Sequence, residues 1–127
     1  MKNEEVDSLF LKVHLSFYKS GLSSKLGSAR SNVLLTLATY MNERGGCYPT
    51  QRQLAERSGM DLKTINKHIN SLLAVRINGK PIVTRELVSR NSYKNSIYTI
   101  HPISQISIFK GEIEQIDNDY VFETVRL

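Results

Sequence analysis

Between positions 61 and 73, residue types alternate so that a helix would have one polar and one apolar side. With about 100° between successive residues, the polar side holds Lys63, Thr64, Lys67, Asn70 and Ser71, with Asn66 and His68 at its edges. Lysine can donate to N7 and O6 of guanine, asparagine can form two hydrogen bonds with adenine, and a threonine methyl can meet the methyl of thymine. The same row also suits an ordinary solvated helix face. The surrounding elements must decide between these two interpretations.

Two short helices joined by a tight turn are predicted to carry this row. The apolar side of the second helix is Leu62, Ile65, Ile69, Leu72 and Leu73, at the spacing of a helix that packs on a core. Asp61 is placed to cap its first turn, where a carboxylate meets the positive end of the helix dipole. Thr50 and Gln53 have the spacing of a capping box for the first helix, and Gly59 has the residue type that ends one.

A longer helix is predicted upstream, with Ser28 as its N-cap and its end near Asn42. Its apolar stripe is Val33, Leu34, Leu37, Tyr40 and Met41. Gly45 and Gly46 follow and permit the left-handed conformations that end helices. Before it, Leu11, Val13 and Leu15 alternate like a short strand, whereas Phe17, Leu22 and Leu26 suit a helix that ends at Gly27. We predict a helix over roughly 15–26.

The character of the chain changes after Leu73. "NGKP" is a turn signal, and "IVTRELVS" and "SIYTIH" are rich in β-branched and aromatic residues. With "RNSYKN" between them, these two segments predict a β-hairpin with a polar, basic tip. "PISQISIF" suits either a short helix or a strand. The residues after Gly111 show no clear period and are predicted to be mobile or to pack on a partner.

The charge of the chain is unevenly distributed. Residues 8–110 contain 15 Lys and Arg against four acidic residues, a net charge of +11, whereas residues 111–127 hold one Arg and five acidic residues. This asymmetry indicates a polyanionic partner, although a merely soluble basic surface would also explain it. A membrane surface is less favoured as the partner, because the sequence shows no basic amphipathic helix with exposed large apolar residues. The absence of a long apolar run, the N-terminal "MKNEEVD" and the single Cys47 are typical of a cytoplasmic protein.

The sequence contains no catalytic signature, and we predict that the protein is not an enzyme and uses no cofactor. There is no G-x-S-x-G, H-E-x-x-H or paired-Cys motif, and Gly79-Lys80 lacks the other residues of a phosphate-binding loop. His14, His68 and His101 are too widely spread for local metal-ligand spacing. The acidic residues after Gly111 lack a calcium-loop pattern. No metal site is predicted.

The stretch "YPTQRQLAERSGMDLKTINKHINSLL" resembles the helix-turn-helix of winged-helix proteins from Gram-positive bacterial plasmids, phages and other mobile elements. The resemblance lies in the aromatic-Pro-Thr start, Gln53-Leu54-Ala55, Gly59, and the Asp61–Ile65 start of the second helix. It covers about residues 10–102. It implies an α+β fold, with a three-helix core and a β-hairpin wing. The chain would divide into an acidic lead (1–9), a winged helix-turn-helix domain (10–110) and an acidic tail (111–127).

The resemblance implies double-stranded DNA as the partner and contacts by ten residues: Arg52, Arg57, Lys63, Thr64, Asn66, Lys67, Asn70, Arg90, Tyr93 and Lys94. Residues of the second helix would read bases. Arg52, Arg57, Arg90 and Lys94 would hold phosphates, and Tyr93 would pack on sugar or cover the hairpin. Such domains serve in transcription regulation, replication initiation and plasmid partition. The alternative is a protein-interaction module without base readout.

A homodimer is a further expectation, because one recognition helix covers only a short DNA site. The candidate dimer surfaces are two apolar segments: Phe10, Leu11 and Val13 near the N-terminus, and Ile106, Ile108 and Phe109 near the other end. The competing interpretation is that both segments complete the core of a single chain.

Overall fold

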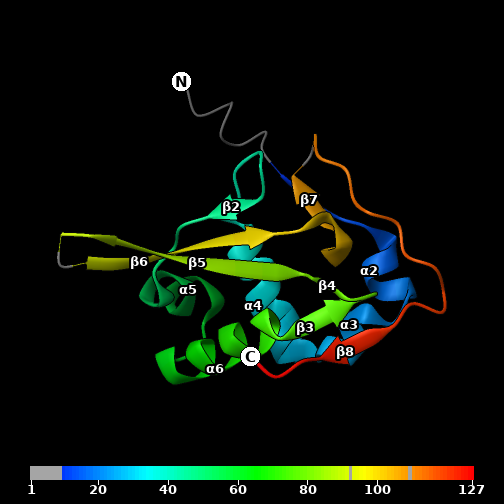
Figure 1. Ribbon diagram of the computed structural model, residues 1–127, viewed down its shortest axis with the longest axis horizontal. Coiled ribbons are helices and arrows are strands. Elements are labelled where there is room, and N and C mark those ends of the chain that lie inside the picture. The colour runs from blue at the N-terminus through cyan, green and yellow to red at the C-terminus, as the bar shows by residue number, and fades with distance from the viewer. Residues whose placement is uncertain (1–9, 92, 109) are drawn as a thin grey trace.

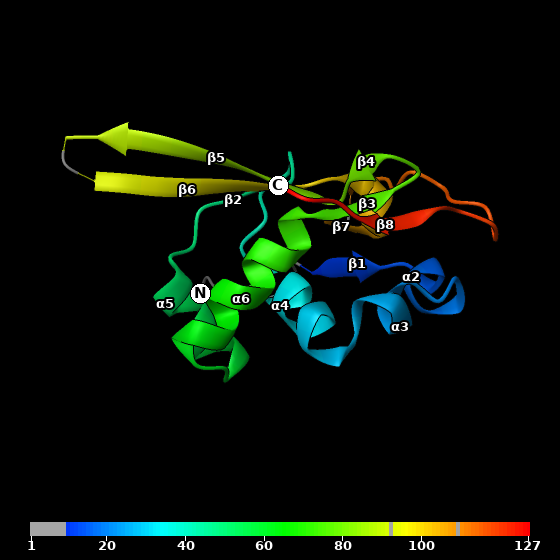
Figure 2. The same ribbon diagram turned by 60° about the horizontal axis from the view of Figure 1, so that its bottom comes forward.

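The computed structural model describes residues 10–91, 93–108 and 110–127. Its helices are α2 (Leu15–Lys19), α3 (Leu22–Leu26), α4 (Ser28–Ala38), α5 (Gln51–Ser58) and α6 (Leu62–Leu73), with a 3-10 turn at Pro102–Ser104 (Figure 1). In Figure 2, α3–α6 form a layer below the strands. Within the described residues, no helix has the length and apolar character needed to span a membrane.

In the described part of the chain, the strands form three small antiparallel sheets. The largest joins β2 (Gly46–Cys47), β6 (Tyr93–Ile100) and β5 (Val83–Arg90), in that order. A second joins β4 (Lys80–Pro81), β3 (Val75–Ile77) and β8 (Phe122–Thr124). The third pairs β1 (Leu11–Val13) with β7 (Ile106–Ile108). The sheets cover the helix layer and close one core.

The core lies between the helices and the base of the β5–β6 hairpin. Leu37 of α4, Leu54 of α5 and Ile65 of α6 are fully buried in the same cluster as Tyr98 of β6. Cys47 is also buried there, and this burial raises the pKa of its thiol to about 12. The thiol therefore stays protonated at neutral pH and packs as a small apolar side chain.

The predicted single helix over 15–26 is wrong in one respect, because this segment forms two helices. Gly21 adopts a left-handed backbone conformation, with φ of 83°, and separates α2 from α3. A continuous right-handed helix cannot contain such a residue. Leu11–Val13 forms the strand that its alternation allowed, because β7 supplies a pairing partner nearly a hundred residues away.

The predicted boundaries of the long upstream helix are also corrected. Ser28 is the first residue of α4, and Gly27 stands at the N-cap position without a side-chain cap. The helix ends at Ala38 and not near Asn42, because the amides of Tyr40 and Met41 bond carbonyls three residues back. Such bonds tighten the end of a helix. Val33, Leu34 and Leu37 are buried as predicted, whereas Tyr40 and Met41 lie beyond the helix and are partly buried.

The predicted caps around the turn are confirmed. The Thr50 hydroxyl accepts from the Gln53 amide at 3.1 Å, and the Gln53 side chain accepts from the Thr50 amide at 2.8 Å. Gly59 ends α5 with φ of 79°, and the Asp61 carboxylate accepts from the Thr64 amide at 2.7 Å. These local contacts set where α5 begins and ends and where α6 begins.

We expect Thr50→Ala to lower the free energy of unfolding by about 1 kcal/mol, because it removes the hydroxyl that accepts from the Gln53 amide in the capping box. Ser24→Ala, at an exposed helical position, should change it by less than about 0.5 kcal/mol. Urea denaturation followed by circular dichroism measures both. Equal effects of the two substitutions would mean that the cap does not stabilise the turn.

The predicted hairpin is confirmed as β5 and β6, paired in register from Val83–Ile100 to Arg90–Tyr93. The long link between Leu73 and Ile82 is also ordered, because Asn78 and Gly79 turn the chain between β3 and β4. "PISQISIF" contains both predicted alternatives, a 3-10 turn followed by β7. The β5–β6 hairpin therefore follows directly along the chain after β3 and β4 of a small additional sheet.

The C-terminal segment packs on its own chain, which corrects the prediction of a mobile or partner-bound tail. β8 pairs with β3, and Tyr120 is only 7% exposed. The Tyr120 hydroxyl donates to the Ser20 carbonyl at 3.0 Å, and the ammonium of Lys25 lies 4.2 Å from the ring centre. Buried Gln105 donates to the Glu114 carbonyl at 2.7 Å. These partners are distant in sequence, so local periodicity carries no sign of them.

We expect Tyr120→Phe to destabilise the fold by about 1 kcal/mol, since the Ser20 carbonyl loses its donor inside a packed contact. Tyr18→Phe removes the hydroxyl of a side chain that is 58% exposed, and it should be close to neutral. Thermal unfolding of the two variants beside the parent protein tests this. A neutral Tyr120→Phe would indicate that β8 is held by its backbone pairing alone.

Candidate nucleic-acid interface

The two helices of the turn and the β5–β6 hairpin frame one side of the molecule. The hairpin projects beyond α5 and α6 at the left of Figure 1, and α6 begins at the same end in Figure 2. The first turns of α6 are therefore not covered by the small sheets, which lie at the opposite end. A rod-shaped partner could contact the helix and the hairpin together.

The exposed face of α6 is rotated from the predicted one. Lys63, Asn66, Lys67 and Asn70 are exposed, together with Leu62, whereas Thr64 and Ser71 are partly buried. Arg30 of α4 covers that flank, since its Nη1 donates to the Ser71 hydroxyl at 3.0 Å. Leu62 was predicted in the buried stripe but is 50% exposed.

Asn66 and Asn70 form a connected pair on this face. The Asn70 amide nitrogen donates to the Asn66 side-chain oxygen at 2.9 Å, one helical turn apart. The bond restricts both side chains, and the Asn66 amide nitrogen keeps its donor capacity. A restricted side chain loses less conformational entropy when it binds.

The charged groups of α6 have distinct roles. The Asp61 cap accepts the Thr64 amide hydrogen, which lowers the pKa of the carboxyl, with nearby Lys63 adding to the effect. Burial lowers the pKa of His68, and the neighbouring Lys67 and Arg30 lower it further. Because His68 is therefore neutral at pH 7, the positive charge of the exposed face comes from Lys63 and Lys67.

The two arginines of α5 differ in their surroundings. Arg52 lies in the first turn and is exposed. Arg57 is also exposed, but its guanidinium lies 4.0 Å from the ring centre of Tyr40 and donates to the Thr39 hydroxyl at 3.0 Å. Arg57 therefore fastens α5 to the end of α4, and any phosphate contact would compete with these bonds.

The register of the hairpin separates its two faces. Arg85 pairs with Tyr98, and Ser89 pairs with Lys94, so these four side chains share a face. Tyr98 is buried in the core, which identifies this face as the one directed toward the helices. Lys94 is exposed on it, and so is Arg85, which sequence reasoning missed. The alternation of residues along the strand, which places Val83 and Arg85 on the same face, was the sequence signal that could have identified Arg85. Arg90 and Tyr93 pair with each other at the tip, but their side chains lie outside the described part of the structure.

A shallow hollow of roughly 600 Å³ lies where α5 and α6 begin. It is lined by Gln51, Leu62, Lys63, Asn66 and Lys67. Gln51 and Leu62 are further residues that sequence reasoning did not assign to the site. The hollow therefore combines three polar or charged side chains of α6 with one exposed apolar side chain.

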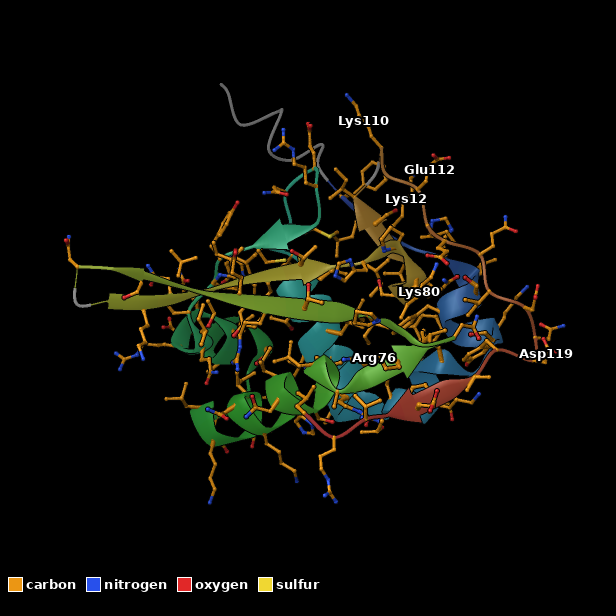
Figure 3. The ribbon with its side chains drawn as sticks, in the orientation of Figure 1. Lys12, Arg76, Lys80, Lys110, Glu112 and Asp119 are labelled. Atoms are coloured by element: carbon orange, nitrogen blue, oxygen red, sulfur yellow. The ribbon has the colours of Figure 1, made fainter. Side chains whose placement is uncertain are left out.

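Several acidic residues of the C-terminal segment lie away from this surface. Figure 3 shows Glu112 and Asp119 at the end of the molecule opposite the hairpin tip. Glu114 forms an ion pair with Lys80, in the same distant region. Glu86 lies on the opposite face of the hairpin from Arg85 and Lys94, since it pairs with Ile97. Glu112 and Asp119 therefore do not face the exposed start of α6.

Comparisons with known proteins agree with this geometry over part of the chain. A family model described as a helix-turn-helix domain matches residues 26–73, which comprise α4, α5 and α6 with the end of α3. No curated protein and no solved structure matches the chain. Domains of this type place their second helix in the major groove of DNA. Residues 26–73 therefore form a helix-turn-helix domain, followed by a β-hairpin wing in an α+β fold.

Proposed function

We propose that the protein binds specific sequences of double-stranded DNA, with α6 in the major groove and the β5–β6 hairpin along the backbone. The observation that carries this proposal is the exposed face of Lys63, Asn66, Lys67 and Asn70 on the second helix of the matched domain. An α-helix fits the major groove, where lysine and asparagine have hydrogen-bonding partners on base edges. Arg52, Arg85 and Lys94 would neutralise phosphates on either side.

Within this function, we propose a transcription regulator or a replication or maintenance factor of a plasmid or phage. This narrower role rests on the resemblance of residues 48–73 to winged-helix proteins of mobile elements. The physical features common to both roles are a basic binding surface and side chains suited to base readout.

The test is selection of bound duplexes from a random DNA library, followed by titration of the enriched sequence. One enriched motif, bound at least about a thousandfold more tightly than scrambled duplex, is expected for specific recognition. Failure to bind any duplex at about 50 mM salt would contradict the proposal, because nonspecific electrostatic binding should be measurable there.

A protein-interaction module is the second candidate. It is favoured by an apolar hollow of about 610 Å³ whose lining includes Phe10, Leu11, Met41 and Ile108. Phe10 is 58% exposed beside it. The DNA titration separates the candidates, since such a module needs no affinity for duplex DNA.

Pairing of two copies on a two-fold DNA site is also part of the proposal. β1 and β7 pair within one chain, and Ile106 is buried there, so most of the expected dimer surface serves the monomer. Phe109 lies outside the described residues. The hollow beside Phe10 is the remaining candidate contact. Light scattering with and without the selected duplex tests it, and one chain per DNA at all concentrations would contradict pairing.

A further inference from the structure

The side chain of Leu62 is exposed to solvent, and neither the packing of the core nor the start of α6 requires this exposure. Its side chain is 50% exposed, although the sequence pattern predicts it among the buried residues of the helix. An apolar contact often fixes the start of a helix, between the residue before the N-cap and the fourth helical residue. Those positions are Met60 and Ile65, and both belong to the core or pack against it. The start of α6 is therefore stabilised without Leu62.

The residues around Leu62 form a small surface that combines hydrogen-bonding groups with one apolar side chain. It shares the shallow hollow with Gln51, Lys63, Asn66 and Lys67. Asn66 lies one turn after Leu62 on the same side of α6, so an apolar side chain and an amide point toward the same partner. Of the residues lining the hollow, Leu62 is the apolar one. A partner that buries it must supply an apolar group between hydrogen-bonding groups.

Thymine presents this combination in the major groove. Its C5-methyl group is apolar and lies beside the O4 acceptor, and the paired adenine offers N7 and N6. Cytosine lacks the methyl group, and a phosphate offers only charged oxygens. If the methyl group of thymine packs against Leu62, the Asn66 amide remains free to bond an adenine edge.

We propose that Leu62 selects thymine at one position of the DNA site by burying its C5-methyl group in this hollow. The inference rests on the proposed function and adds a base preference that the lysines and asparagines alone do not supply. Lysine and asparagine contacts select purines through N7 and its neighbours. Leu62 selects a pyrimidine through an apolar contact.

The experiment replaces each thymine of the selected duplex, one at a time, with deoxyuridine, which lacks only the methyl group. For the parent protein, deoxyuridine at one position should weaken binding by about threefold to fivefold, which is the effect expected for one buried methyl-sized group. Leu62→Ala should weaken binding to the original duplex and make that position insensitive to deoxyuridine. Leu62→Met, which keeps an apolar side chain of similar volume, should retain most of the sensitivity.

Leu15→Ala is the matched control, because Leu15 is 69% exposed on α2 and outside the hollow. This variant should keep the deoxyuridine sensitivity of the parent. Thermal unfolding of each variant shows whether it is folded. If Leu62→Ala cannot be studied because it unfolds, the parent and Leu62→Met still decide whether a methyl-dependent position exists and whether an apolar side chain supports it.

Two results would overturn the inference. One is a parent protein that binds its selected duplex with full discrimination but is insensitive to deoxyuridine at every thymine. The other is a folded Leu62→Ala variant that keeps the parent's sensitivity. Both leave sequence-specific DNA binding in place. A parent protein that binds no duplex would instead contradict the proposed function itself.

Discussion

The affinity of the protein for duplex DNA is expected to fall by about fortyfold when salt rises from about 50 to about 200 mM. The reason is the number of exposed cations assigned to the DNA backbone. They are Arg52, Arg85 and Lys94. Each phosphate neutralised releases counterions and contributes about −0.9 to the slope of log affinity against log salt. Three such contacts give a slope of about −2.7.

Fluorescence anisotropy of a labelled random duplex, titrated at several salt concentrations, measures this slope. Lys94→Gln should reduce its magnitude by about one for every sequence tested. Lys19→Gln is the control and should leave the slope unchanged. Lys19 is exposed in the last turn of α2, on the side of the molecule away from the hairpin tip (Figure 1). A slope shallower than about −1 would show that α5 and the hairpin do not contact the backbone together.

The second large effect is a loss of sequence discrimination when the exposed face of α6 is altered. Lys67→Ala or Asn66→Ala should weaken the selected site by ~1–3 kcal/mol and change binding to scrambled duplex much less. Both side chains are exposed and line the hollow at the start of α6. Asn66 also accepts a hydrogen bond from Asn70, so its loss also releases the Asn70 side chain.

Lys94→Ala is the matched comparison, since it removes one positive charge from the hairpin rather than from the helix. It should weaken selected and scrambled duplexes by similar factors. All three substitutions are at exposed positions and should change the free energy of unfolding by less than about 0.5 kcal/mol. If folded Lys67→Ala and Asn66→Ala both keep the parent's discrimination, α6 is not the helix that reads the bases.

The sequence determined those features that depend on contacts within a few residues. The Thr50–Gln53 capping box, the Gly59 helix end and the Asp61 cap are bonds between residues at most four apart. The β5–β6 hairpin follows from two adjacent segments of β-forming residues. Local propensity therefore sufficed to predict the helix-turn-helix and the wing.

The tertiary structure alone decided which side of α6 is exposed and how the ends of the chain pack. Arg30 of α4 covers the Ser71 flank, whereas Leu62 and Asn66 are exposed to solvent. β1 pairs with β7, and β8 pairs with β3, across long separations in the sequence. Helical periodicity records which residues share a side but not which neighbour covers that side. The exposed face of α6 is therefore set by tertiary packing, including the contact of Arg30 from α4.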